Sequence, residues 1–269
     1  MTEYFHQFVR IEQGVVNSII IDFLHNKLFH IDNVTIKKFY NNKYNSIQDF
    51  VNRAREEKLL IKIKERTWIP YFNFKKEKQM ENNINYLTLE VDEGVNLEII
   101  KRKINYISNA YISRIITYGK NKKINAKKIL IKGNIIKQIY KKKNFKDCVN
   151  KSEVKPWLTK ELNVYKYQFN MSYNSCWGKK IAISNEGNVR PCIYSHLSLG
   201  NFYNQPTEEV IERLTKYWNI TKDNIEICKD CEFRYLCFNC PEYNYIKTND
   251  LYKKNPSCSY NPYSGKWIS

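Results

Sequence analysis

The stretch CKDCEFRYLCFNC, residues 228–240, places four cysteines within thirteen residues at the spacing C-x2-C-x5-C-x2-C. Thiols at this density form disulfides, hold a metal or react chemically. Three more cysteines lie close by in the sequence, at positions 176, 192 and 258, and Cys148 stands apart from them. Residues 1–147 contain no cysteine, so any thiol chemistry is confined to the C-terminal half of the chain.

Composition indicates a globular protein in a reducing compartment. The chain has 269 residues, 42% of them hydrophobic, which is enough to bury a core without covalent staples. No run of apolar residues reaches the length of a membrane span, and residues 1–20 lack the pattern of a secretory signal. We therefore expect a cytoplasmic protein without a membrane partner, in which clustered cysteines are metal ligands or catalytic thiols.

The segment CWGKKIAISNEGNVRPC, residues 176–192, predicts a β-hairpin. Two short strands, 180–183 and 189–190, flank the turn SNEGN, in which Gly187 supplies the positive φ of a tight turn. Such a hairpin brings Cys176 and Cys192 together at its open end, as two ligands of one metal centre require. Cys258 lies in the Pro- and Asn-rich segment NPSCSYNPYSGKW, for which we expect a loop.

Seven thiols in this region allow three interpretations. Two structural zinc ions need eight ligands, and Cys148 or His196 could supply the eighth. Disulfides are the least expected, because of the compartment and the odd count. Two iron–sulfur clusters fit best, because an incompletely ligated cluster is chemically reasonable whereas an incompletely ligated structural zinc is not. The four histidines show no ligand spacing, and we assign them no metal.

The order C-x10-G-x4-C, C-x2-C-x5-C-x2-C and a final C resembles the SPASM domain, the C-terminal extension of radical SAM enzymes that mature ribosomal peptides. The spacing departs from that family by one residue before Cys240. YWNITKDNIEICKDCEFRYLC (217–237) and CSYNPYSGKW (258–267) are similar to a narrower group, the peptide maturases of grasp-with-spasm systems. In those systems an ATP-grasp ligase and a precursor peptide are the partners.

The resemblance implies a SPASM domain over residues 171–269 and two [4Fe-4S] clusters. It makes four cysteines the ligands of an outer cluster, namely Cys228, Cys231, Cys237 and Cys258. It makes three the ligands of an inner cluster, namely Cys176, Cys192 and Cys240. The fourth ligand of the inner cluster stays open, and Cys148 is left out of the set because a lone cysteine is commonly a small buried hydrophobe.

The N-terminal stretch predicts strand, strand, helix, helix. NSIIIDF (17–23) and KLFHI (27–31) form a hairpin turning at His25 and Asn26. VTIKKFYNN (34–42) has helical spacing, and SIQDFVNRAREEKLLIKI (46–63) begins with the N-cap candidate Ser46 and places Leu59 on its apolar face. Taken alone, this indicates a plain α+β subdomain, but the resemblance implies a winged-helix-like, leader-binding module over residues 1–78.

Residues 79–170 predict an α/β unit with a short parallel sheet. We expect strands at 85–91, 110–119 and 126–134, a helix at 96–109 and a short helix at 135–143. Radical SAM enzymes need a C-x3-C-x2-C motif, which this chain lacks. The segment therefore resembles a degenerate, truncated radical SAM-like barrel, and we expect neither bound SAM nor its cleavage.

The net charge of +18 is unevenly spread, with fifteen lysines and three acidic residues between Lys120 and Lys166. Such a segment attracts polyanions through forces that salt screens, unless it is simply a solvated lysine coat. The charge and the twenty-one tyrosines leave a zinc-bearing nucleic-acid binder as one alternative, although no nucleic-acid motif is present. A stand-alone cluster enzyme is the other. The favoured expectation is a protein that binds a precursor peptide and assists an ATP-grasp ligase in its maturation.

Overall fold

The computed structural model describes residues 2–63, 84–90, 98–99, 102–103, 114–118, 135–139, 162–238 and 240–268. The predicted strand at 126–134 and Cys148 lie outside these residues. None of the described helices combines the length and the apolar composition needed to cross a bilayer.

A three-stranded antiparallel sheet organises the N-terminal unit. It is formed by β2 (Val9–Gln13), β3 (Asn17–Asp22) and β4 (Lys27–Asp32), with β3 in the centre. The predicted hairpin of β3 and β4 is confirmed, with Asn26 in the left-handed conformation at its turn. Three successive isoleucines of β3, residues 19–21, are fully buried. Since neighbouring strand residues point to opposite faces, both faces of this sheet must be covered.

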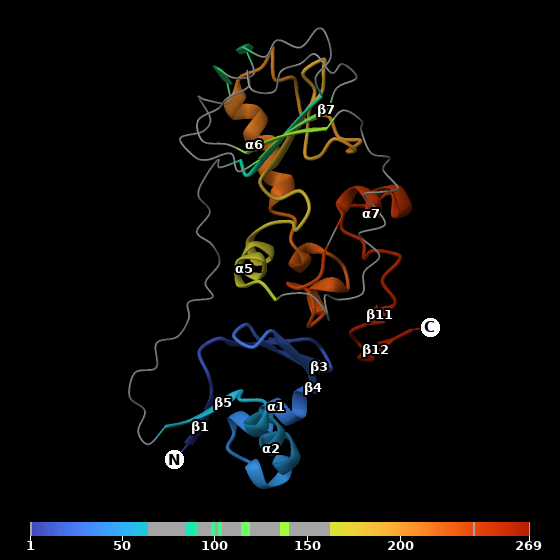
Figure 1. Ribbon diagram of the computed structural model, residues 1–269. Helices are drawn as coiled ribbons and strands as arrows, with labels where there is room; N and C mark the ends of the chain where they lie inside the picture. The colour runs from blue at the N-terminus through green and yellow to red at the C-terminus, as the bar shows by residue number, and fades with distance from the viewer. Residues whose placement is uncertain are drawn as a thin grey trace.

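Helices cover one of these faces. Ile20 packs with Ile36 of α1 (Asn33–Tyr40) and Ala54 of α2 (Gln48–Glu56). Asp32 caps α1 by accepting a hydrogen bond from the Thr35 amide at 2.8 Å. The opposite face, with Ile19 and Ile21, packs against residues of the C-terminal region (Figure 1). The predicted order strand, strand, helix, helix is thus confirmed, while the winged-helix assignment stays a prediction.

The second helix differs from its prediction at both ends. A 3-10 turn, η1 (Tyr44–Ile47), precedes α2, and Ser46 donates its hydroxyl to the Lys43 carbonyl at 2.9 Å instead of capping the helix. Leu59 lies beyond the end of α2, because Lys58 adopts a positive φ of 60°. The chain then enters β5 (Leu60–Ile63), which pairs with β1 (Thr2–Phe5). Neither of these two strands nor β2 was predicted.

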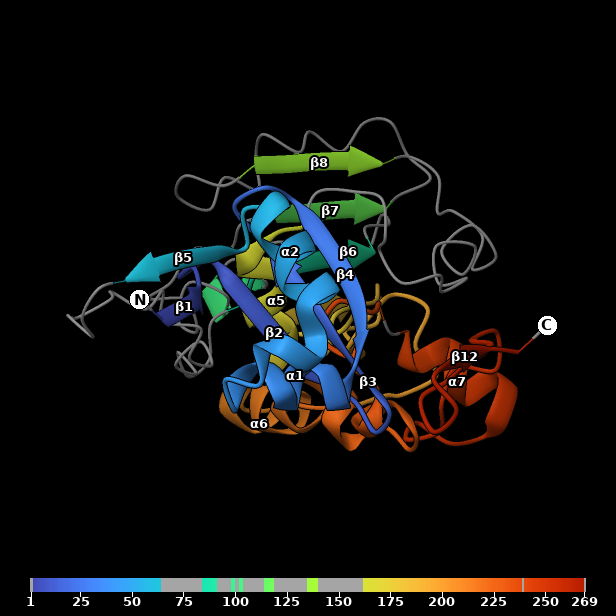
Figure 2. The ribbon, with the colours of Figure 1, turned by 90° about the horizontal axis from the view of Figure 1, so that it is seen from below.

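A second, five-stranded sheet has the strand order β10-β9-β6-β7-β8. The strands β6 (Tyr86–Glu90), β7 (Arg114–Tyr118) and β8 (Ile135–Ile139) run parallel, as their arrows show in Figure 2. The predicted strands at β6 and β7 and the parallel sheet are confirmed. The predicted helix at 135–143 is wrong, because residues 135–139 form β8. Residues 98–99 and 102–103 of the predicted helix 96–109 are helical.

The sheet extends across the predicted boundary at residue 170. β9 (Lys180–Ile183) pairs in parallel with β6, and β10 (Val189–Arg190) pairs antiparallel with β9. The amphipathic helix α6 (Thr207–Trp218) covers this sheet, packing Leu214 and Trp218 against its buried side chains. Of two further helices, α5 (Val164–Ser172) precedes the cysteine region, and α7 (Pro241–Thr248) lies within it, between Cys240 and Cys258. The last element is the small β11–β12 pair (Tyr260–Asn261, Lys266–Trp267).

Replacing Gly187 by alanine should weaken the β9–β10 hairpin. Its φ is +84°, and an added Cβ would lie 2.5 Å from the Tyr203 ring. We expect Gly187→Ala to lower the free energy of unfolding by about 2 kcal/mol, measured by urea denaturation of the whole chain. Gly187→Asn, which tolerates positive φ better but meets the same ring, separates backbone strain from the contact. An alanine variant as stable as the parent would contradict this account of the turn.

Candidate metal centre

The β9–β10 hairpin delivers the first pair of cysteines. Cys176 precedes β9 and Cys192 follows β10, and both thiols pack into one cluster with Cys240. The predicted meeting of Cys176 and Cys192 at the open end of the hairpin is therefore confirmed. Cys240, the N-cap residue of α7, joins them from a segment more than forty residues further along the chain.

A buried asparagine fixes the turn that carries Cys176. The Asn174 side-chain oxygen accepts hydrogen bonds from the amides of Cys176 and Trp177, at 2.8 and 2.9 Å. Its side-chain nitrogen donates to the Ile220 carbonyl at 2.9 Å, which ties the turn to the segment after α6. Asn174 is only 1% exposed, so water does not replace these bonds. This residue positions the first cysteine set, and no motif in the sequence marked it.

The first set lies in an apolar shell. Trp177 is fully buried beside the three thiols, and Leu197 and Tyr217 pack against the cluster. The hydrogen bond from the Cys240 thiol lowers the pKa of Cys176 to about 6, although burial acts in the opposite direction. The same bond raises the pKa of Cys240, and burial raises the pKa of Cys192 to about 12. Cys176 is thus the thiol of this set most ready to bind a metal as a thiolate.

The second set consists of Cys228, Cys231, Cys237 and Cys258. The 3-10 turn η5 (Cys228–Asp230) and the turns that follow it carry the first three, and Cys258 approaches from the C-terminal loop. All four are close enough to Lys222 to act on its charge. Burial raises the pKa of Cys228 and of Cys231, and that of Cys237 to about 11. The two sets contain the same cysteines as the outer and inner groups that the family resemblance implied, and their role as cluster ligands stays a prediction.

Lys222 is an unusual neighbour of the second set, because it is a lysine buried beside thiols. It is 5% exposed, and its Nζ lies 3.8 Å from the Cys228 Sγ. Burial by itself would lower the pKa of this ammonium, yet the pKa is raised because the charges of Cys237, Cys228, Cys258 and Cys231 outweigh the loss of water. A capping box holds the turn in place, with Thr221 and Asn224 bonding reciprocally on either side of the lysine. A buried positive charge thus faces the four sulfur atoms of the second set.

The sulfur spacing bears on which metal the cysteines suit. All seven described cysteines are free thiols. Tetrahedral zinc holds its thiolate sulfurs about 3.8 Å apart, given Zn–S bonds of about 2.3 Å. Within the described residues, no three cysteine sulfurs lie within 4.8 Å of one another. The spacing therefore favours an inorganic core of several atoms over a single zinc ion in either set.

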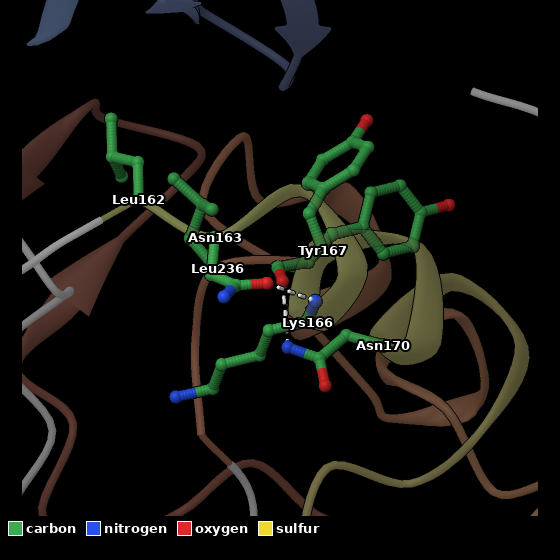
Figure 3. A pocket seen from close by; sticks show the side chains of 7 residues that line it. Leu162, Asn163, Lys166, Tyr167, Asn170 and Leu236 are labelled. Atoms are coloured by element: carbon green, nitrogen blue, oxygen red, sulfur yellow. Dashed lines mark hydrogen bonds between the residues drawn. The ribbon is translucent and has the colours of Figure 1, made fainter. Parts of the chain in front are cut away.

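Helix α5 is hydrogen-bonded to the loop that carries the second set. Asn163 caps the helix by accepting from the Lys166 amide at 3.0 Å, and Asn170 donates to the Tyr235 carbonyl at 2.8 Å (Figure 3). Tyr235 in turn donates its hydroxyl to Asp223, the neighbour of Lys222. A chain of hydrogen bonds therefore connects α5, the cysteine loop and the lysine turn.

The N-terminal unit rests on the same loop. Glu232, next to Cys231, pairs with His30 of β4 at 2.7 Å and accepts a hydrogen bond from Tyr260. Arg234 donates to the Glu12 carboxylate at 3.0 Å, and Val15 donates its amide to the Asp230 carbonyl at 3.2 Å. The carboxylate of Glu232 is fully buried, whereas the side chain of its partner His30 is 40% exposed. The cysteine loop is thus a docking surface for β2 and β4.

Two histidines meet in space although no sequence spacing predicted it. His6, Asp22 and His25 bring their ligand-type atoms within 4.8 Å of one another. Asp22 accepts from the amides of Leu24 and His25, and His25 Nδ1 lies 2.6 Å from its second oxygen. The Phe8 amide donates to His6 Nδ1, which assigns the proton of a neutral ring to Nε2 and leaves no lone pair there for a metal. We therefore interpret this group as a hydrogen-bonded cap of the β3–β4 turn, in which His6 and Asp22 are buried and His25 is exposed.

The remaining histidine, His196, is stacked on Tyr245 with ring centroids 3.6 Å apart and bonds through Nδ1 to the buried Glu242. Sequence patterns assigned none of the four histidines to a metal. In the described residues each of them instead faces a carboxylate.

Comparison with known families identifies the cysteine region. Residues 176–232 match the model of the SPASM family, an iron–sulfur cluster-binding domain. This part of the chain is an iron–sulfur-binding SPASM domain. The match spans the hairpin, the lysine turn and the first four of the seven cysteines. No curated protein matches the chain.

Removing the Asn174 side chain should open the turn that carries Cys176. Asn174→Ala leaves two amides and one carbonyl unpaired in the interior, and we expect a loss of about 3 kcal/mol in the free energy of unfolding. Asn174→Asp keeps the acceptor for the two amides but turns a buried carboxylate oxygen toward the Ile220 carbonyl, and should cost at least as much. Urea denaturation of the full chain measures both. Equal stabilities for the three proteins would show that the turn does not depend on this side chain.

Proposed function

We propose that the protein holds two [4Fe-4S] clusters and assists the maturation of a ribosomally made peptide. Cys228, Cys231, Cys237 and Cys258 would ligate the outer cluster. Cys176, Cys192 and Cys240 would ligate the inner one and leave one iron open to another ligand. The observation that carries the proposal is Lys222, because a buried ammonium needs anionic partners and four thiolates on an iron–sulfur core supply them.

The residues around both sets suit such clusters. Apolar side chains, among them Trp177 and Leu251, exclude water from the inner thiols, and Lys222 and the loop amides offset negative charge at the outer ones. Bound clusters would supply electron transfer or, at an open iron, a Lewis-acid site. The chain has no C-x3-C-x2-C motif, so we propose that it does not bind or cleave SAM by itself. A reducing cytoplasm is the compartment that suits these thiols.

The N-terminal sheet offers a place for a peptide. Among the described strands β4 pairs only with β3, so its outer edge presents unpaired backbone groups. The Asn33 amide donates to the Val16 carbonyl at 3.1 Å, so this amide points toward β3. Along an antiparallel strand the amides point alternately toward and away from the neighbouring strand, and the amides of Leu28 and His30 therefore point toward the open edge of β4. An extended precursor could add there as a further strand. The proposed partner is an ATP-grasp ligase, which would receive the bound peptide, and the lysine-rich segment 120–166 would attract acidic groups on either partner.

Metal analysis tests the cluster part of the proposal. Protein purified without oxygen should contain about eight iron and eight sulfide per chain, four of each per cluster, and no stoichiometric zinc. Cys231→Ser should lose about half of the iron, whereas Cys148→Ser, outside both proposed sets, should keep all of it. Zinc in place of iron would refute the proposal and favour the nucleic-acid alternative.

Backbone methylation tests the peptide part. If a precursor peptide encoded beside this chain adds as a strand, N-methyl groups at alternate leader positions should weaken binding at least about tenfold, by removing hydrogen bonds. The positions between them should be nearly neutral, because their amides point away from the sheet. Calorimetric titration of the full chain with each methylated peptide measures the two affinities. Uniform sensitivity along the leader would contradict strand addition, and no binding at all would remove the peptide from the proposal.

A further inference from the structure

We infer that Lys222 sets the electrostatic balance of the outer cluster and makes it the first of the two clusters to accept an electron. This inference rests on the proposed function, since it requires that the four cysteines hold a redox-active core. It assigns a role to a residue that is not itself a ligand.

The placement of Lys222 is specific. The side chain is buried, its Nζ bonds to Cys228 Sγ at 3.8 Å, and it also contacts the Cys237 thiol. The capping box around it leaves the turn little freedom, and Asp223 on the far side is bound by the Tyr235 hydroxyl at 3.0 Å. Lys229, only one residue from Cys228, is by contrast exposed to solvent. The burial of Lys222 is therefore not a general property of lysines near the cysteine loop.

No carboxylate in the described part of the chain lies within salt-bridge distance of Lys222. Neighbouring cations behave differently, since Arg234 pairs with Glu12 and Lys253 pairs with Glu226. A buried ammonium without a carboxylate is costly unless another anion offsets it. The four sulfurs are the groups whose charge acts on it. The positive charge is thus directed at the metal site and at nothing else described.

A fixed cation favours the more negative member of a redox pair. One-electron reduction adds one negative charge to the core, so the ammonium stabilises the reduced cluster more than the oxidised one. Because the site is buried, the interaction is strong and salt screens it little. Lys222 therefore raises the reduction potential of the outer cluster.

Around the inner set the fixed charges are more nearly balanced. Glu242, 2% exposed and two residues after Cys240, places a carboxylate close enough to act on the Cys192 thiol. Lys180 acts on Cys176 and, more strongly than Glu242, on Cys192, but it is only half-buried and is partly solvated. At the outer set the buried Glu232 acts on Cys231, but it bonds to none of the described sulfurs, whereas the Lys222 ammonium bonds directly to Cys228. The inner cluster should therefore be harder to reduce, and an electron entering the protein should rest on the outer cluster.

Redox titration of the purified holoprotein tests the inference. A chemical reductant supplies the electrons through mediator dyes, and electron paramagnetic resonance follows each cluster. Lys222→Met keeps the length of the buried stem and removes the charge, and it should lower the reduced-to-oxidised ratio of the outer cluster at least about tenfold at fixed potential, which is a shift of about 59 mV to lower values. Lys229→Met removes the same formal charge from an exposed position and should leave the midpoint unchanged. Repeating the titration in Cys231→Ser identifies which signal belongs to the outer cluster.

Two further variants keep the outcome decisive. Lys222→Arg retains the charge and should stay near the parent potential, and Lys222→Gln is a second neutral variant if the methionine one does not fold. An unchanged outer potential in a neutral variant with full iron content would overturn the inference while leaving the proposed function intact. Equal shifts for arginine and methionine would also overturn it, because packing would then be the cause. A parent protein without iron would instead refute the proposed function itself.

Discussion

The contact between the buried Lys222 ammonium and the sulfurs around it is the main electrostatic constraint on the cysteine loop. Removing an ammonium from water costs several kcal/mol, which only nearby negative charge offsets. The capping box, the cysteine loop and α5 together hold the lysine and the thiols in place. The N-terminal unit packs on the same loop through Glu232 and Arg234. One charged site thus lies at the meeting point of both halves of the molecule.

Elements whose apolar pattern has one interpretation were predictable from the sequence. The β3–β4 hairpin, β6, β7 and the β9–β10 hairpin belong to this class. The strand β8 was not predictable, because the apolar residues of IIKQI fit the repeat of a helix as well as that of a strand. Pairing with β7 selects the strand. The end of α2 is similar: Glu57, Lys58 and Leu59 favour helix, but the residues that follow pair with β1, from the other end of the unit.

The candidate ligands of the site were predictable from the sequence, whereas the residues that position them or lie against them were not. Spacing predicted that Cys176 and Cys192 meet, and the resemblance to the SPASM domain divided the seven thiols into the two sets that the structure brings together. Asn174 and Lys222 were missed because their roles arise from contacts with residues distant in sequence or from burial, and one lysine among forty-five basic residues carries no signal. Glu232 and His30 were missed for the same reason, since they lie about two hundred residues apart. A buried polar side chain next to a ligand becomes visible only in three dimensions.

The parallel pairing of β6 with β9 has a consequence for how the chain is made. Tyr86 meets Lys180, so the two strands are separated by about ninety residues of sequence. A ribosome adds roughly 5 to 20 residues per second, and β6 therefore waits about 5 to 20 s for the neighbour that completes its side of the sheet. The N-terminal unit closes its own small sheet within residues 9–32 and does not share this delay. During synthesis the N-terminal sheet can therefore fold first, and the sheet that carries the cysteine region is completed last.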